Sequence, residues 1–136
     1  MERPIFQPVG TPVEELDTPA LVLDLDVMDK NIQTFQGYFA TTTAKARPVV
    51  TSHLCPQIAH RQLDAGGTVG GIAVTTLGEA EVFANSGFDD ILLANQVVTV
   101  SKIRRLCALA AQVSIGIAVD NLDNAQQLSS GAVAAG

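Results

Sequence analysis

Gly71-Ile72-Ala73-Val74-Thr75-Thr76-Leu77-Gly78-Glu79 opens the stretch of sequence that decides the fold. Residues 71–75 form a short apolar run, which is typical of a strand buried on both faces. Thr76 and Glu79 have the spacing of a capping box, so a helix is predicted to begin here and to end at Gly87. Residues 90–95 form a second apolar run. Strand, helix and strand in this order predict two parallel strands joined by a right-handed crossover.

The same alternation extends on both sides of this unit. Upstream, residues 19–24 and 46–51 are predicted strands, although Pro48 removes one hydrogen-bond donor from the second of them. Downstream, residues 114–120 are a fifth predicted strand. Five such units fit an open, doubly wound sheet of the flavodoxin type, which would be complete at this length. They also fit the first part of a (β/α)₈ barrel, which needs about 250 residues to close. Periodicity does not separate these two architectures.

An amphipathic helix is expected after each strand. Asp26 is the predicted cap of the first helix, and Asp120 is the predicted cap of the fifth, which runs from Asn121 to about Ala135. The second helix is predicted from Pro56 to about Asp64. The expected apolar stripes consist of Met28, Ile32, Phe35 and Phe39; of Ile103, Leu106 and Ala110; and of Leu122, Ala125, Leu128 and Ala132.

Composition narrows the classes of function. The chain has 136 residues, 47% of them hydrophobic and 16% charged, which indicates a globular protein. A net charge of −6 argues against a nucleic-acid surface, because such a surface needs clustered Lys and Arg. No apolar run approaches the roughly 18–20 residues of a membrane span.

A cytoplasmic location is expected from the start of the chain and from its cysteines. Residues 1–4, Met-Glu-Arg-Pro, lack the basic-then-apolar order of a secretory signal. Cys55 and Cys107 do not have metal-type spacing, and we expect both to be reduced thiols.

Several sequence blocks, in order, resemble one enzyme family. The blocks are Leu16-Asp17-Thr18-Pro19-Ala20-Leu21-Val22-Leu23-Asp24, Asp29-Lys30-Asn31-Ile32, Arg47-Pro48 with His53 and Cys55-Pro56, Thr76-Leu77-Gly78-Glu79-Ala80-Glu81, and Asp89-Asp90-Ile91-Leu92-Leu93-Ala94-Asn95. They are similar to the D-threonine aldolase and D-serine dehydratase family, which has an alanine-racemase-type N-terminal barrel. The resemblance covers roughly residues 15–125 and favours the barrel. It implies a partial barrel domain over residues 17–136, and residues 1–16, which are Pro-rich and irregular, are interpreted as an N-terminal arm.

The resemblance also implies a pyridoxal-phosphate enzyme that acts on D-amino acids, but the cofactor site differs here. The family pattern at the end of the second strand is like Arg-Pro-His-x-Lys-Thr-His-Lys, whose first lysine binds the cofactor as a Schiff base. Here residues 47–54 read Arg-Pro-Val-Val-Thr-Ser-His-Leu, so Thr51 takes the place of that lysine. A hydroxyl cannot form an imine, so Thr51 is not competent in that role. Lys30, Lys45 and Lys102 are not expected to replace it.

Four other residues are candidate contacts of the cofactor. Arg47 and His53 persist from the family pattern, and Asn95 and Gln96 follow the fourth strand, at the end where barrel active sites collect. Local alternatives stand beside each: Arg47 could pair with a carboxylate, and His53 could bond to nearby backbone. The family's divalent metal is assigned to a C-terminal β-domain. This chain has two histidines, His53 and His60, without metal-ligand spacing, and no metal site is expected.

Three readings of function remain open. The first is a truncated, inactive relative of a pyridoxal-phosphate-dependent D-amino-acid lyase. The second is a functional binding or regulatory module without catalysis. The third is part of an active aldolase or dehydratase completed by another chain. Self-association or a complementing chain is expected, because strands one and five would be open edges.

Overall fold

The computed structural model describes residues 7–136, so the first six residues of the predicted arm lie outside the described part. Within residues 7–136 the elements occur in the order η1 (Val13–Glu15), α1 (Leu25–Ala40), η2 (Val50–Ser52), α2 (Pro56–Asp64), β1 (Ile72–Val74), α3 (Leu77–Ala84), β2 (Asp90–Leu93), α4 (Val100–Ala110), β3 (Ser114–Ile117) and α5 (Leu122–Ala135), where η marks a 3₁₀ helix. The predicted α/β class is confirmed.

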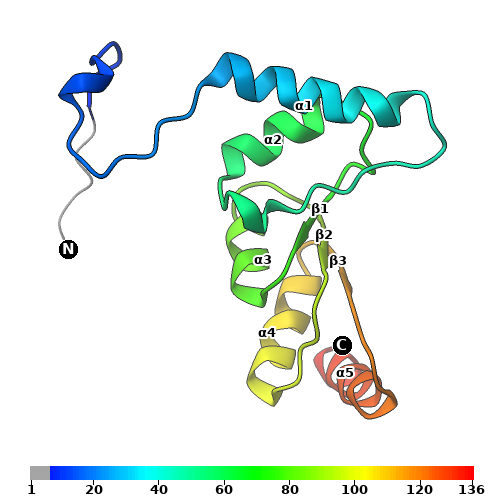
Figure 1. Cartoon of the computed structure of the whole chain (residues 1–136). Helices are drawn as coiled ribbons and strands as arrows, with labels where there is room; N and C mark the ends of the chain where they lie inside the picture. Colours follow the sequence, from blue (N-terminus) through cyan, green and yellow to red (C-terminus); the bar gives the residue numbers. More distant parts are fainter. Residues whose placement is uncertain (1–6) are drawn as a thin grey trace.

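The strands form one open parallel sheet in the order β1-β2-β3. Ile72 is paired with Ile91, and Ile91 with Ile115, so the stretch that begins at Gly71 forms the predicted strand–helix–strand unit. α3 packs against β1 and β2, α4 against β3, and α5 against α4 (Figure 1). Three of the five predicted strands are therefore present as regular strands.

The second predicted strand, residues 46–51, is reduced to two parallel bridges beside β1. Ala46 is bridged to Thr68 and Val49 to Ala73. Pro48 supplies only its carbonyl, which accepts from the Ala73 N–H at 2.7 Å. The strand also ends early, because residues 50–52 turn into η2. Since a proline has no N–H to donate, the ladder cannot be continuous here.

The first predicted strand does not form. Residues 19–24 pair with no strand, and Leu21 is 106% exposed. The segment projects from the body and leads into α1 (Figure 1). Its neighbour in a parallel sheet would be residues 46–49, and no backbone bond joins the two. The prediction of a buried strand at 19–24 is wrong because apolar composition alone does not supply a pairing partner.

Side-chain caps fix where the helices begin. Thr76 caps α3 as predicted, accepting from the Glu79 N–H at 3.2 Å. The cap of α1 is Asp24 and not Asp26, and the cap of α5 is Asn121 and not Asp120. In both corrected cases the cap is the residue just before the first helical one, and the predicted acidic residue lies one or two positions from it.

The helical faces differ from the predicted stripes at several positions. In α1 the one buried residue is Gln36, whereas Phe35 is 58% exposed. In α4 Leu109 is buried in place of Ala110, and in α5 Leu122 is 71% exposed. α1 packs mainly on α2, and α5 mainly on α4, so each buries a narrower and differently directed stripe than a helix laid on a complete sheet.

The core lies between one face of the sheet and helices α2, α3 and α4. Ile91 and Leu93 of β2 point into it, where they meet Phe83 of α3 and Leu106 of α4. Leu92, between them, points to the other face and is 37% exposed. Along parallel strands successive side chains alternate between faces, so the second face of this sheet is left without a helical layer.

Candidate functional site

The carboxyl ends of β1 and of the 46–49 segment bring a polar cluster together. Thr51 Oγ1 donates to Glu79 Oε2 at 2.8 Å, and the Thr75 N–H donates to the same oxygen at 2.9 Å. Thr51 Oγ1 also lies 3.4 Å from Thr75 Oγ1. Residues at this edge of a parallel sheet line the usual ligand site of α/β folds. The cluster of Thr51, Thr75 and Glu79 is the candidate functional site.

Glu79 is the charged centre of this cluster. Burial raises the pKa of its carboxyl, but hydrogen bonds from the Thr75 backbone, the Thr51 hydroxyl and Thr76 outweigh burial, so the pKa lies below its ordinary value of 4.5. The carboxylate is therefore ionised at neutral pH, and its nearest partners are hydroxyl and backbone donors.

We expect the Thr51–Glu79 bond to contribute stability in a pH-dependent way. A lowered pKa in the folded state means that the contribution is present above pH 4.5 and is lost as the pH falls through the folded-state pKa. T51V should therefore lower the free energy of unfolding by about 1 kcal/mol at pH 7. In urea titrations the gap between wild type and E79Q should also close below pH 4.5. A gap that stays constant with pH would show that the carboxylate is not held by these bonds. S52A, at a neighbouring exposed hydroxyl, is the control for T51V.

Arg47 lies at the opposite end of the sheet from Thr51. Its guanidinium donates to both carboxylate oxygens of Asp90, each at 3.0 Å, and to the Ile72 carbonyl at 3.3 Å. This two-pronged geometry is the strong form of an Arg–carboxylate pair. Of the two roles open to Arg47 in the sequence, pairing with a carboxylate is the one that the structure adopts.

The remaining candidate residues, His53, Asn95 and Gln96, make no hydrogen bond to Glu79. His53 Nδ1 accepts from the Cys55 N–H at 3.1 Å, and its Nε2 lies 3.3 Å from Gln62 Oε1. Asn95 Nδ2 donates to the Thr75 carbonyl at 3.2 Å, so Asn95 adjoins the cluster from β2. Gln96 is exposed. The structure thus brings Thr51 and Asn95 to the two sides of Thr75 and directs the His53 ring toward α2.

The lysines lie elsewhere. Lys45 Nζ donates to the Phe39 carbonyl at 3.0 Å, at the end of α1, and Lys30 and Lys102 are exposed on α1 and α4. His60 is exposed too; its ring stacks on that of Phe88 with the ring centroids 4.2 Å apart, and its Nε2 lies 3.1 Å from the Ser86 carbonyl oxygen.

Among residues 7–136, no three His, Cys, Asp or Glu side chains gather as a metal site. In the same range no helix is both long and apolar enough to cross a bilayer.

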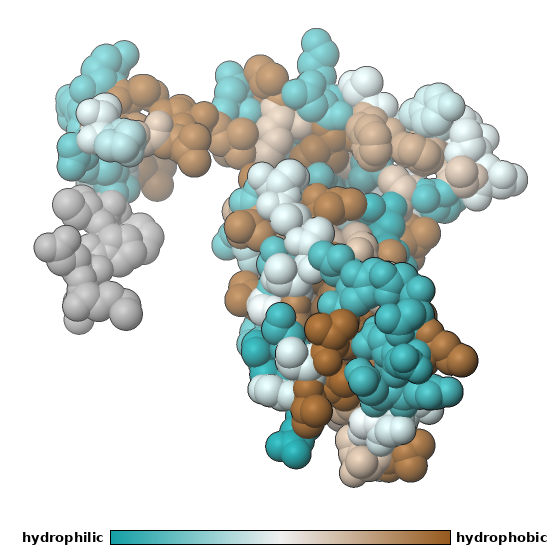
Figure 2. Space-filling model, turned by 60° about the horizontal axis from the view of Figure 1, so that its bottom comes forward, coloured by the Kyte–Doolittle hydropathy of each residue, from teal (hydrophilic) through white to brown (hydrophobic). Residues whose placement is uncertain are grey.

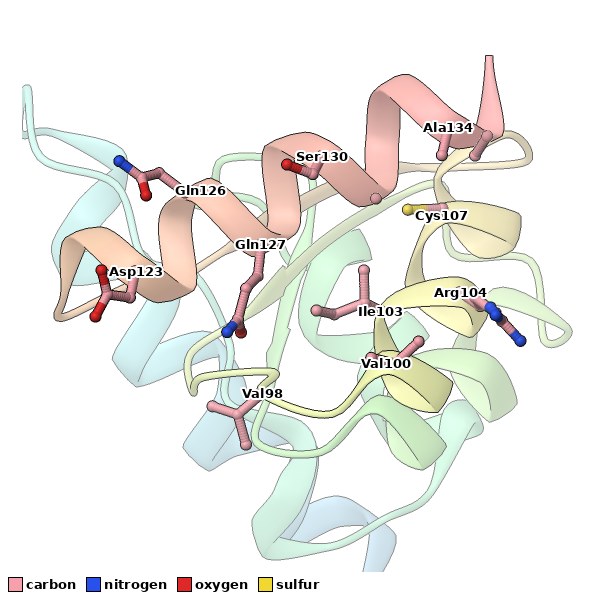
Figure 3. Close-up of a pocket in the computed structure, with 12 residues that line it drawn as sticks. Val98, Val100, Ile103, Arg104, Cys107, Asp123, Gln126, Gln127, Ser130 and Ala134 are labelled. Carbon is pink, nitrogen blue, oxygen red and sulfur yellow. The ribbon is translucent and has the colours of Figure 1, made fainter.

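A groove of about 970 Å³ lies between α4 and α5, and Val98 of the segment that follows β2 also lines it. Ile103 of α4 and Gln127 of α5 are among the residues that line it (Figure 3). It is lined mainly by α4 and α5, and its two charged residues, Arg104 and Asp123, do not form an ion pair with each other. Its size reflects the small side chains of α5, including Ser130 and Ala134, and we do not place the functional site there.

Known proteins resemble this chain over nearly all of its length. D-threonine aldolase from Arthrobacter sp. is 38% identical over 133 residues, which are 98% of this chain and 34% of that protein. A crystal structure of D-threonine aldolase from Filomicrobium marinum matches with a TM-score of 0.83 and 39% identity, over 88% of this chain and 32% of that one. The chain is homologous to part of D-threonine aldolase. No family model matches the sequence.

Two further relatives extend the comparison beyond D-threonine aldolase. The 3-hydroxy-D-aspartate aldolase of Paracoccus denitrificans is 32% identical over 90% of this chain and 32% of its own length. The D-threo-3-hydroxyaspartate dehydratase of Delftia sp. is 43% identical over 58% of this chain and 20% of its own length. The chain thus spans about a third of the length of D-threonine aldolase, and the sequence resemblance to this group of enzymes is confirmed.

Two contacts were not anticipated from the sequence. Glu79 was predicted only as a member of a capping box, yet its carboxylate also accepts from the Thr51 hydroxyl. The capping-box spacing was the available signal, because it turns Glu79 back toward the end of β1. The second is the contact of Arg47 with Asp90 at the start of β2, which is separated from the 46–49 segment by β1, and no local pattern in the sequence signals it.

Proposed function

We propose that the chain is the barrel part of a D-amino-acid lyase of the D-threonine aldolase and D-serine dehydratase type, and that it does not form the cofactor imine. The observation that carries this proposal is the bond from Thr51 Oγ1 to Glu79. Position 51 is where the family resemblance puts the cofactor lysine. In this chain the residue at that position is a threonine, whose hydroxyl donates a hydrogen bond to the Glu79 carboxylate.

The residues present do not fit covalent attachment of pyridoxal phosphate. The cofactor supplies an aldehyde that must be attacked by an unprotonated primary amine, and Thr51 has none. Lys45 bonds to the end of α1, and Lys30 and Lys102 lie on outer helix faces. The charged group closest to position 51 is the Glu79 carboxylate, which repels a phosphate and does not bind it.

The other proposed site residues then have different roles. Asn95, and with it Gln96, lies at the mouth of the strand ends and is free to contact a small ligand on its exposed side. We assign His53 to fixing the turn before α2, through the Cys55 N–H. We assign Arg47 to joining the 46–49 segment to β2 through Asp90, because its guanidinium is already engaged there.

A second candidate function is a part of an active enzyme that another chain completes. The uncovered sheet face, where Leu92 is exposed, and the open edge at β3 favour it. Under this alternative the substrate is a D-amino acid and the second chain supplies the amine, the phosphate contacts and any metal.

Residues 17–136 would act as one domain in both cases. The free thiols Cys55 and Cys107 support a cytoplasmic location.

Borohydride trapping tests the absence of an imine. We expect the chain, mixed with one equivalent of pyridoxal phosphate, to show no imine absorbance and, after reduction, no stoichiometric adduct in a peptide map. T51K is the matched control, because it places a primary amine at the position where the family resemblance puts the cofactor lysine. A stoichiometric adduct at Lys30, Lys45 or Lys102 in the unchanged chain would overturn the proposal. Recovered activity only on adding a second chain would favour the completed-enzyme alternative.

A further inference from the structure

The segment between β2 and α4, residues 94–99, carries the two candidate ligand contacts Asn95 and Gln96. Its two ends are attached to neighbouring elements. Near the first end Asn95 Nδ2 donates to the Thr75 carbonyl at 3.2 Å, and at the last residue Thr99 caps α4 with its side chain. The end of the molecule from which α4 and α5 begin comes forward in Figure 2, where hydrophilic residues gather beside hydrophobic ones.

The middle of the segment is attached to α5 by Asn124. Asn124 Nδ2 donates to the Val97 carbonyl at 2.9 Å. Val97 is 2% and Asn124 4% exposed, so this bond is shielded from water and its geometry is well defined. The Asn124 N–H also donates to the Asn121 side chain at 2.7 Å, so the cap of α5 fixes the backbone of the residue that donates to Val97.

Gln96 lies between these two attachments. The side chain of the residue before it is bonded to the end of β1, and the carbonyl of the residue after it is bonded to α5. The Gln96 side chain is exposed. Its carboxamide offers a ligand both N–H donors and an acceptor oxygen. Two fixed neighbours restrict the backbone at Gln96, so the direction in which this carboxamide is presented depends on the bond from Asn124.

Stability alone does not account for an asparagine at position 124. Within residues 7–136 the buried Oδ1 atom of Asn124 has no hydrogen-bond partner. A buried acceptor without a partner costs at least as much free energy as one neutral hydrogen bond contributes, so the bond from Nδ2 to Val97 is offset within the same side chain. The main effect of Asn124 is therefore to fix the position of the Val97 carbonyl.

We propose that Asn124 is a positioning residue of the candidate site. Together with Asn95 it sets the course of residues 94–99, and it thereby presents the Gln96 carboxamide at the carboxyl ends of the strands. The inference rests on the proposed function in one respect, the assignment of ligand contact to Asn95 and Gln96. The bonds that carry it involve neither Thr51 nor a cofactor.

Backbone order parameters from NMR relaxation of the full chain test this role. N124D keeps the shape of the side chain, but its carboxylate cannot donate to the Val97 carbonyl. At about pH 8 we expect the order parameter of the Gln96 N–H to fall from about 0.85 to below about 0.6, whereas residues of β1 and β2 keep their wild-type values. N124A removes the donor without adding a charge and should give the same fall.

Acidification distinguishes a lost donor from a general loss of packing. Toward about pH 4 the introduced carboxyl group of N124D takes up a proton and gains an O–H donor. We expect the order parameter at Gln96 to return toward the wild-type value in N124D and to stay low in N124A. The wild type is measured at both pH values, with circular dichroism to confirm the fold.

L109A is the matched control for a loss of stability. Leu109 is 6% exposed in the last turn of α4, at the other end of that helix from residues 94–99. L109A should lower the free energy of unfolding and leave the order parameter at Gln96 unchanged. An unchanged order parameter in N124A, or an equal fall in L109A, would overturn the proposal, and N124A decides should N124D not fold. An imine formed by the unchanged chain would overturn the proposed function and leave these order parameters as they are.

Discussion

F83A is expected to lower the free energy of unfolding by about 3–5 kcal/mol. Phe83 of α3 is 1% exposed and meets Phe88 edge-to-face at 5.5 Å, against β1 and β2. Truncation leaves a cavity that the close-packed surroundings cannot fill, so the cost exceeds the transfer energy of the lost ring. Urea unfolding followed by circular dichroism measures the change.

The control for this result is F35A. Phe35 is 58% exposed on α1 and contacts Phe39 at 5.2 Å, so its removal should cost less than about 1 kcal/mol. Equal losses at the two positions would contradict the placement of the core on the α3 side of the sheet. Should F83A fail to fold, I91V offers a smaller step, with an expected loss of about 0.5–1.5 kcal/mol.

G71A is the second change expected to have a large effect. Gly71 is buried where the Arg47 side chain crosses to Asp90, and a Cβ there would collide with the Arg47 guanidinium, the Asp90 carboxylate and the Asp90 backbone oxygen. The backbone oxygen cannot move without disturbing the start of β2. We expect a loss of about 1–3 kcal/mol in unfolding free energy, together with loss of the ion pair.

G78A provides the contrast at a second glycine. Gly78 lies in the first turn of α3, and a Cβ added there would have nothing within 4 Å. Alanine restricts the unfolded chain and suits a helix, so we expect a gain of about 0.4–1 kcal/mol. Urea titrations of both variants should therefore change in opposite directions. A neutral G71A would show that the Arg47–Asp90 pair is not closely packed against β1.

The sequence predicts correctly the part of the fold whose elements contact one another within one continuous stretch of chain. Residues 71–95 contain their own cap, their own turn and both paired strands, so local signals were enough to define them. Residues 19–24 carry an equally apolar pattern, but whether they pair depends on an edge supplied from elsewhere. The predictions of the caps of α1 and α5 were wrong for a smaller reason. Two acidic or amide residues lie near the start of each helix, and the sequence alone does not show which of the two is the cap.

The candidate site was predictable in its position but not in its bonds. The family pattern and the strand-end rule both pointed to Thr51 and Asn95, and both adjoin Thr75 in the structure. That Glu79 would satisfy Thr51 depends on the rotation of α3 relative to β1, which no local pattern encodes. Arg47 was expected near a cofactor from the family resemblance alone. Its carboxylate partner, Asp90, is distant in sequence and is identified only by the structure.

The projecting segment has a consequence for how the sequence can diverge. Residues 7–24 add no rung to the sheet, and none of them is buried in the core. Substitutions in this segment leave the hydrogen-bond ladder of the sheet and the hydrophobic core of the chain intact. From Ala46 onward, by contrast, most apolar residues of the strands have side chains buried in the core on one face of the sheet. Sequence change in the two regions is thus constrained differently: the core positions of the downstream part are constrained by the folding of residues 46–136, whereas this constraint does not act on residues 7–24.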